Sequence, residues 1–154
     1  MNSIYSMYVN QWERTRLRTI RYAEKAPEEL YEYKISNRSF SFREQLIHIV
    51  QWELEMYQRL NDPRLNCLVL SEESLETKEE LLEVLHQVKE VTQKNLRLLG
   101  TDIFSRSILI DDTSTPFYEV LLDLLDHESH HRGQLVSGYR VNALVPPDYE
   151  NPDG

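Results

Sequence analysis

Three histidines lie close together near the end of the sequence, and they are the residues best suited to chemistry. His127, His130 and His131 fall within five positions of a chain that has five histidines in all. In a helix, residues four apart project from the same face, so His127 and His131 would present two imidazoles one turn apart. Two imidazoles on a rigid element can reach one metal ion. The spacing therefore predicts part of a metal site, although it names no substrate.

The surrounding residues predict which histidines face inward. On a helical wheel, the apolar side chains of this segment gather on one face, formed by Phe117, Val120, Leu121, Leu124, Leu135 and Tyr139. His127 and His131 fall within that face, whereas His130 points well away from it. An inward imidazole must be neutral and needs a partner for its nitrogens. A metal ion would satisfy both histidines, and so would hydrogen bonds to polar core partners such as Glu53 and Glu128.

A third candidate ligand lies far upstream, in another amphipathic segment. His48 sits at the edge of the apolar stripe of residues 41–60, beside Trp52. An edge position suits a ligand at the mouth of a cleft, and it equally suits a half-exposed histidine.

Three neutral imidazoles around a divalent ion would leave at least one coordination position open, as in catalytic sites. An open position on zinc lowers the pKa of a bound water, or holds a thiol as its nucleophilic thiolate. Imidazoles suit zinc, nickel, copper or iron, of which we expect zinc or nickel. Glu53 and Glu128 are candidates to orient a histidine through its second nitrogen.

Four long segments with helical periodicity must position these histidines. They cover residues 3–26, 41–60, 77–100 and 115–141. Four helices with one apolar face each predict an all-α protein built as a four-helix bundle. The connections at 27–40 and 61–76 exceed a tight turn, which favours a long crossover connection. Residues 103–110 alternate in part between apolar and polar, and we expect a short extended piece there.

Local signals mark where these helices begin. Ser41 with Glu44, and Thr77 with Glu80, match the reciprocal capping box at a helix start. The last segment opens at Thr115-Pro116, which matches an N-cap followed by proline at the first helical position.

Composition indicates one ordinary globular domain. The chain has 154 residues, 40% hydrophobic and 28% charged, and we expect a single domain over residues 1–145 with a tail at 146–154. The net charge of −9 disfavours binding to nucleic acid or anionic membranes, and no apolar run could span a bilayer. A lone cysteine, Cys67, and the lack of an apolar leader make the cytoplasm the expected location.

Two motifs together resemble a known family. The segments NRSFSFREQLIH (37–48) and HESHHRGQL (127–135), followed by PPDY (146–149), resemble the DinB-like (YfiT-like) metalloenzyme superfamily over nearly the whole chain. This superfamily is distinct from the translesion polymerase that shares the DinB name. The resemblance implies a four-helix bundle with an unusual connection order, often as a homodimer. It also implies three ligands, His48, His127 and His131.

The resemblance further implies a range of activities. Members with known activities include thiol-dependent transferases and isomerases that act with low-molecular-weight thiols such as bacillithiol or mycothiol. We therefore expect an enzyme for a small-molecule substrate, in which a metal-bound thiol attacks an electrophile. One alternative is a metal-dependent hydrolase with Glu128 as the first candidate for a general base. Another is a metal-binding or stress-response protein without turnover.

Overall fold

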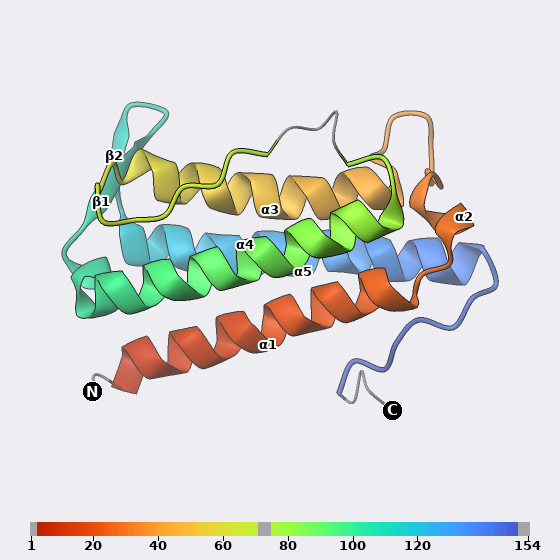
Figure 1. Cartoon of the computed structure of the whole chain (residues 1–154), viewed down its shortest axis with the longest axis horizontal. Helices are drawn as coiled ribbons and strands as arrows, with labels where there is room; N and C mark the ends of the chain where they lie inside the picture. The colour runs from red at the N-terminus through yellow and green to blue at the C-terminus, as the bar shows by residue number, and fades with distance from the viewer. Residues whose placement is uncertain (1–2, 71–74, 151–154) are drawn as a thin grey trace.

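The computed structural model describes residues 3–70 and 75–150, and shows a helical protein with one small sheet (Figure 1). In chain order the elements are α1 (Ser3–Lys25), α2 (Glu28–Tyr31), α3 (Phe42–Arg59), α4 (Lys78–Leu99), the 3₁₀ helix η2 (Gly100–Phe104), β1 (Ser107–Ile110), β2 (Thr113–Pro116) and α5 (Phe117–Val141). The four long helices agree with the expected segments to within two residues at each end. None of the helices described is long and apolar enough to cross a membrane.

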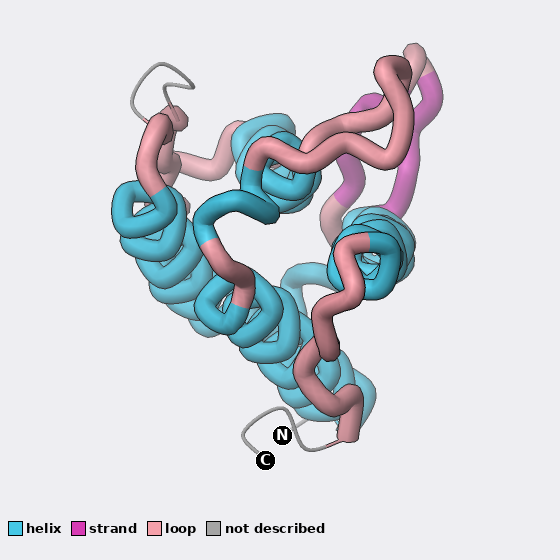
Figure 2. The backbone as a smooth tube through the Cα atoms, turned by 90° about the vertical axis from the view of Figure 1, so that its right-hand side faces the viewer, coloured by secondary structure: helices cyan, strands magenta, loops and turns pink. Residues whose placement is uncertain are grey.

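The four long helices lie alongside one another. α1 packs against α4 and α5, and α3 packs against the same two helices. The colour gradient in Figure 1 shows α1 and α5 running in one direction and α3 and α4 in the other. Because α3 and α4 run the same way, the connection between them returns along the length of the molecule. Figure 2, which looks along the helices, shows the small sheet to one side of them.

Both expected capping boxes are present. The Ser41 hydroxyl accepts a hydrogen bond from the Glu44 N–H at 3.1 Å, and the Glu44 carboxylate accepts one from the Ser41 N–H at 2.6 Å. Thr77 and Glu80 exchange the same pair of hydrogen bonds at the start of α4. These contacts satisfy N–H groups that the helix itself cannot pair. α4 ends at Leu99, and Gly100 follows with φ +52°, a conformation that glycine adopts without strain.

The extended piece expected at 103–110 is shorter than the sequence pattern suggested. Its first residues belong to η2, and only β1 is extended, paired antiparallel with β2. The hairpin turns at Asp111 and Asp112, whose φ values of 46° and 62° suit a two-residue turn between twisted strands. The second strand was not expected, because its residues carry no apolar alternation and are exposed or half-buried.

The predicted start of α5 was wrong, because both the N-cap and the first helical residue lie one position later than expected. Thr115 pairs with Ile108 in the sheet, so it is extended rather than an N-cap. Pro116 is the N-cap, it makes no side-chain capping bond, and the helix begins at Phe117. The Phe117 N–H donates to the Arg106 carbonyl at 2.8 Å. The carbonyl of the residue before β1 therefore satisfies the first N–H of α5 in place of a capping side chain.

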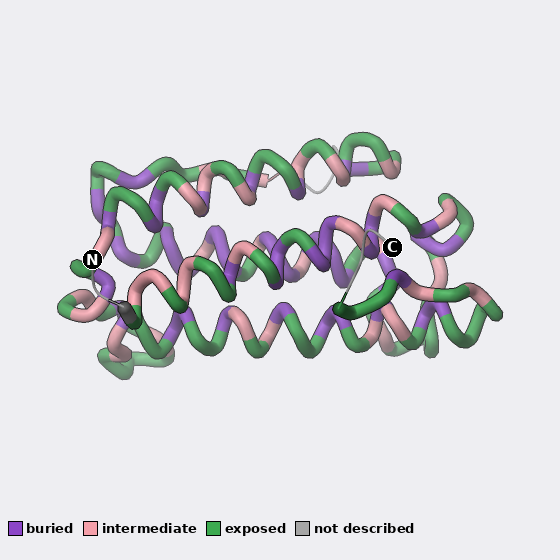
Figure 3. The backbone as a smooth tube through the Cα atoms, turned by 90° about the horizontal axis from the view of Figure 1, so that it is seen from below, coloured by how far each residue is buried: buried purple, intermediate pink, exposed green. Residues whose placement is uncertain are grey.

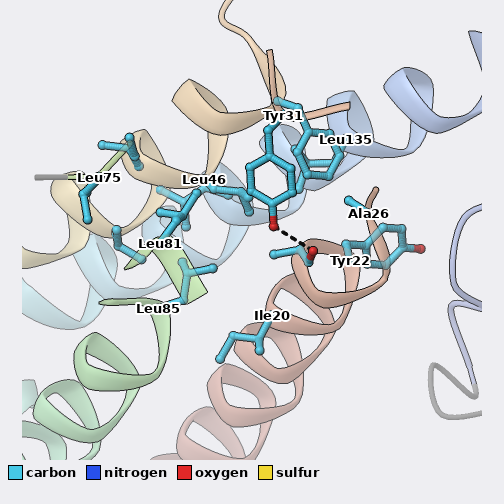
Figure 4. Close-up of a cluster of buried hydrophobic side chains, with 14 of the residues drawn as sticks. Ile20, Tyr22, Ala26, Tyr31, Leu46, Leu75, Leu81, Leu85 and Leu135 are labelled. Atoms are coloured by element: carbon cyan, nitrogen blue, oxygen red, sulfur yellow. Dashed lines mark hydrogen bonds between the residues drawn. The ribbon is translucent and has the colours of Figure 1, made fainter. Parts of the chain in front are cut away.

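The buried residues, whose backbone is coloured purple in Figure 3, recur along each of the long helices. They form two apolar clusters, one around Tyr31, Leu46, Leu81, Leu85 and Leu135 (Figure 4), and one around Trp12, Met56, Leu96, Phe117 and Leu121. In the first cluster the Tyr31 hydroxyl donates to the Ala23 carbonyl at 2.8 Å.

Buried polar side chains lie near the junction of the two clusters. Each long helix contributes at least one of them, including Arg16 from α1, Glu53 from α3, Thr92 from α4 and Glu128 from α5. We call these four residues the polar layer. Buried charges of this kind are tolerated only when they are paired.

The described part of the expected tail lies against α1. The Tyr22 hydroxyl donates to the Pro147 carbonyl at 3.0 Å. The guanidinium of Arg18 stands 4.2 Å from the centre of the Tyr149 ring, within range of a cation–π contact.

Candidate metal centre

Three histidines from two helices converge on one point. The Nε2 atom of His127, on α5, lies 3.2 Å from Nε2 of His48, on α3, and 3.1 Å from Nε2 of His131. All three candidate ligand nitrogens lie within 4.8 Å of one another. Two nitrogens bound to the same tetrahedral zinc ion at about 2.0–2.1 Å stand about 3.3–3.4 Å apart. The donor set fits a divalent ion, and two of the three distances between ligand nitrogens are close to the tetrahedral value.

Helix packing produces this convergence. α3 and α5 lie against each other along their length, and the four-residue spacing places His127 and His131 on the face of α5 that meets α3. His48 enters from the facing side of α3. His130 is exposed, as the helical wheel predicted, while His131 is buried and His48 and His127 are half-buried.

The histidines are electrically neutral at physiological pH. Burial lowers the pKa of His48 and of His127 below the usual value of 6.5. Burial, together with the neighbouring His127 and His48, lowers the pKa of His131 to about 4. A neutral imidazole keeps a lone pair free, which is the form that binds a metal.

Two aromatic rings flank the three imidazoles. The Phe40 ring lies 5.1 Å from the His48 ring and 6.4 Å from the His131 ring, centre to centre. On the other side, the Trp52 ring lies 6.4 Å from His48 and 5.8 Å from His127. Both aromatic side chains are partly exposed. Phe40 precedes α3 and lies outside its helical periodicity, so the wheel could not place it here.

An open groove runs beside His48. It has a volume of about 480 Å³ and is lined by His48, Gln51, Trp52, Glu55, Gln58, Val69 and Leu70. The lining combines apolar side chains and amides with one carboxylate. Of the three clustered histidines, the groove is bordered by His48.

A family model described as the DinB family matches residues 1–147. The chain belongs to the DinB family. The match covers both motifs and all three clustered histidines. No curated protein matches the chain.

In this DinB-family protein, one of the histidines has its second nitrogen held by a side chain that sequence reasoning missed. Nδ1 of His131 is hydrogen-bonded to Oε1 of Gln45. Gln45 is buried on α3, three residues before His48 and therefore on a neighbouring part of the same face. The sequence signal that could have identified Gln45 is its position within the 37–48 motif. Nδ1 of His127 is buried and has no hydrogen-bond partner among the residues that the structure describes.

Glu53 and Glu128 lie in the polar layer, where both bind Arg16. Arg16 donates two hydrogen bonds to Glu128, each 3.0 Å long, and another to Glu53. Trp12 adds a hydrogen bond from its indole nitrogen to Glu53 at 2.9 Å. Burial and the neighbouring Glu128 raise the pKa of Glu53, against the opposing effect of Arg16. That either carboxylate orients a histidine stays a prediction, because the contacts described tie both to α1.

Proposed function

We propose that this DinB-family protein holds a divalent ion, zinc or nickel, on His48, His127 and His131 and uses it to transfer a small thiol to an electrophile. The convergence of three imidazoles carries the proposal, because Nε2 of His127 lies 3.2 Å from Nε2 of His48 and 3.1 Å from Nε2 of His131. The pairwise packing of α1, α3, α4 and α5 supports the four-helix bundle with a long crossover that such members adopt.

An open coordination position favours catalysis over a structural role. Among residues 3–70 and 75–150, the cluster of potential ligands holds the three histidines and no fourth side chain. Structural zinc sites are closed by four protein ligands, whereas catalytic sites keep a position for water or substrate. A bound ion supplies Lewis acidity there, which stabilises a coordinated thiol as its thiolate at neutral pH.

The protein's own residues divide the remaining work. The three imidazoles stay neutral because burial lowers their pKa values, so they bind metal rather than protons. Phe40 and Trp52 flank the imidazoles and restrict water on two sides. The groove beside His48 receives the electrophile, with the Trp52, Val69 and Leu70 side chains offering apolar surface.

The hydrolase alternative needs a general base, and Glu128 was the first candidate. Its side chain is 3% exposed and both its oxygens accept hydrogen bonds from Arg16. A base must reach the proton that it removes, directly or through one water. The contacts of Glu128 therefore favour thiol transfer over hydrolysis through this residue.

Metal analysis of untagged protein tests the ligand set. We expect about one zinc or nickel ion per chain in the wild type, and loss of most of it in His48→Ala, His127→Ala and His131→Ala. His86→Ala is the matched control, because His86 is exposed on α4 and away from the cluster. Full metal content in all three ligand variants would refute the site.

Thiol binding tests the chemistry separately. Addition of a low-molecular-weight thiol to the Co²⁺-substituted protein should produce a sulfur-to-cobalt charge-transfer band, and a panel of electrophiles should then show thiol consumption. If the metal binds but no thiol changes the spectrum, the transferase proposal fails. Turnover of simple esters in its place would support a hydrolase, and no turnover of either kind would support a metal-binding protein without catalysis.

A further inference from the structure

A continuous line of hydrogen bonds leads from the histidine cluster to the surface. His131 Nδ1 is bonded to Gln45 Oε1. The Gln45 amide nitrogen donates to Gln134 Oε1 at 2.5 Å, and the Gln134 amide nitrogen donates to Nε2 of His130 at 2.8 Å. The line crosses from α5 to α3 and back, and it ends at the exposed histidine that the metal site does not use.

The polarity of this line decides which nitrogen of His131 carries the proton. A carboxamide oxygen accepts hydrogen bonds and its nitrogen donates them. With Oε1 of Gln45 facing His131, Nδ1 must be the protonated nitrogen, which leaves Nε2 with its lone pair toward His48 and His127. If both amides were turned over, Nδ1 would accept and Nε2 would carry the proton. That state cannot bind a metal through Nε2.

The outer part of the line holds the amide of Gln45 in place. Gln45 is 4% exposed, so a mispaired amide would leave a buried polar group unsatisfied. Gln134 presents its oxygen to the Gln45 nitrogen and its own nitrogen to Nε2 of His130. In this polarity Nε2 of His130 is the acceptor.

We propose, on the basis of the metal site proposed above, that Gln45 is a positioning residue that sets the tautomer and ring orientation of His131, and that Gln134 and His130 fix the orientation of the Gln45 amide. Metal-binding histidines commonly donate their second N–H to a fixed acceptor, and loss of that acceptor costs about 10–100-fold in metal affinity. Here the acceptor comes from α3, the helix that also carries His48, so one element positions two of the three ligands.

Metal affinity in matched variants tests the proposal. Gln45→Met keeps the side-chain length and removes the acceptor, so its Co²⁺ affinity should fall about 10–100-fold with a changed d–d absorption spectrum. Gln45→Glu restores an acceptor, so it should bind Co²⁺ at least tenfold more tightly than Gln45→Met. Gln93→Met is the control, since Gln93 is a half-buried glutamine on α4 bonded to Glu13 and away from the histidines. Wild-type affinity and spectrum in Gln45→Met, or equal losses in the Met and Glu variants, would overturn the proposal.

A measurement on the metal-free protein separates this inference from the proposed function. The ¹⁵N chemical shifts of the His131 ring report directly which nitrogen is protonated. In the wild type we expect the Nδ1–H tautomer, and in Gln45→Met a shift toward Nε2–H, with a smaller shift in Gln134→Met. An Nε2–H tautomer in the wild type would overturn the inference even if the metal binds. Conversely, failure of the wild type to bind any metal would refute the proposed function. The ¹⁵N measurement would still decide whether Gln45 sets the tautomer of His131.

Discussion

Removal of the one cation of the polar layer should strongly destabilise the protein. Arg16 is 1% exposed and donates to both Glu53 and Glu128, whose side chains are each 3% exposed. Arg16→Met keeps much of the side-chain volume but leaves two buried carboxylates without a counter-charge. Breaking a buried ion pair by removing one partner costs about 3–5 kcal/mol. Since a typical domain is stable by about 5–15 kcal/mol, this is a large part of the total.

The loss should depend on pH in a defined direction. The pKa of Glu53 is already raised, so the folded state holds a proton there more readily than the unfolded state. A group with a raised pKa contributes stability below its unfolded value of 4.5, and that contribution disappears as the pH rises through the folded value. Without Arg16 the pKa of this carboxyl should rise further. The difference between wild type and Arg16→Met should therefore be largest near neutral pH and shrink as the pH approaches 4.5.

Urea denaturation of the metal-free proteins at pH 7.5 and pH 5 measures both effects. Glu53→Gln is the comparison variant, because it leaves one guanidinium facing one carboxylate and should cost only about 1–2 kcal/mol. The double variant Arg16→Met/Glu53→Gln should recover part of the Arg16 loss. A loss below about 1 kcal/mol for Arg16→Met at pH 7.5, or a loss that grows on acidification, would refute this account of the polar layer.

Three further predictions concern the proposed metal site and the helices around it. Burial lowers the pKa of His131 to about 4, so protons compete weakly with the metal above that pH. The Co²⁺ affinity, measured by chelator competition, should therefore change little from pH 7.5 to 6 and fall steeply near pH 4. A steep loss of affinity between pH 7 and 6 would contradict this prediction. Ser41→Ala removes the acceptor that caps α3 and should cost about 1 kcal/mol in thermal or urea unfolding. Gly133→Ala should stabilise α5 by about 0.5–1 kcal/mol, because a Cβ there meets no atom within 4 Å; a destabilised variant would show that this space is not free.

The sequence predicted the elements that depend on local signals. The capping boxes at Ser41 and Thr77 act within one turn of helix, and the structure confirms both. The helical wheel separated His130 from His127 and His131 because side-chain direction follows from helical geometry alone. His48 was selected chiefly by the family resemblance, and the structure brings it to the other two.

Contacts between side chains on different helices could not be predicted from capping signals or helical periodicity. The partner of His131 is Gln45, a residue 86 positions away whose amide could have faced many neighbours. Glu53 and Glu128 were recognised as candidates, but their counter-charge is Arg16 on α1, which nothing in the sequence pattern marked as buried. The strand at 113–116 forms through pairing with β1 rather than through its own alternation, so its residues gave no signal.

The histidine cluster also has a consequence for how the chain is tied together. His48 and His127 are 79 positions apart, and the chain between them includes α4 and the hairpin. A metal ion bound there would act as a reversible cross-link that closes this loop across α3 and α5. Because an unfolded chain cannot hold the three nitrogens together, the ion would bind only the folded form and stabilise it by an amount that rises with the logarithm of its free concentration. The proportion of folded molecules would then report how much metal the surroundings supply.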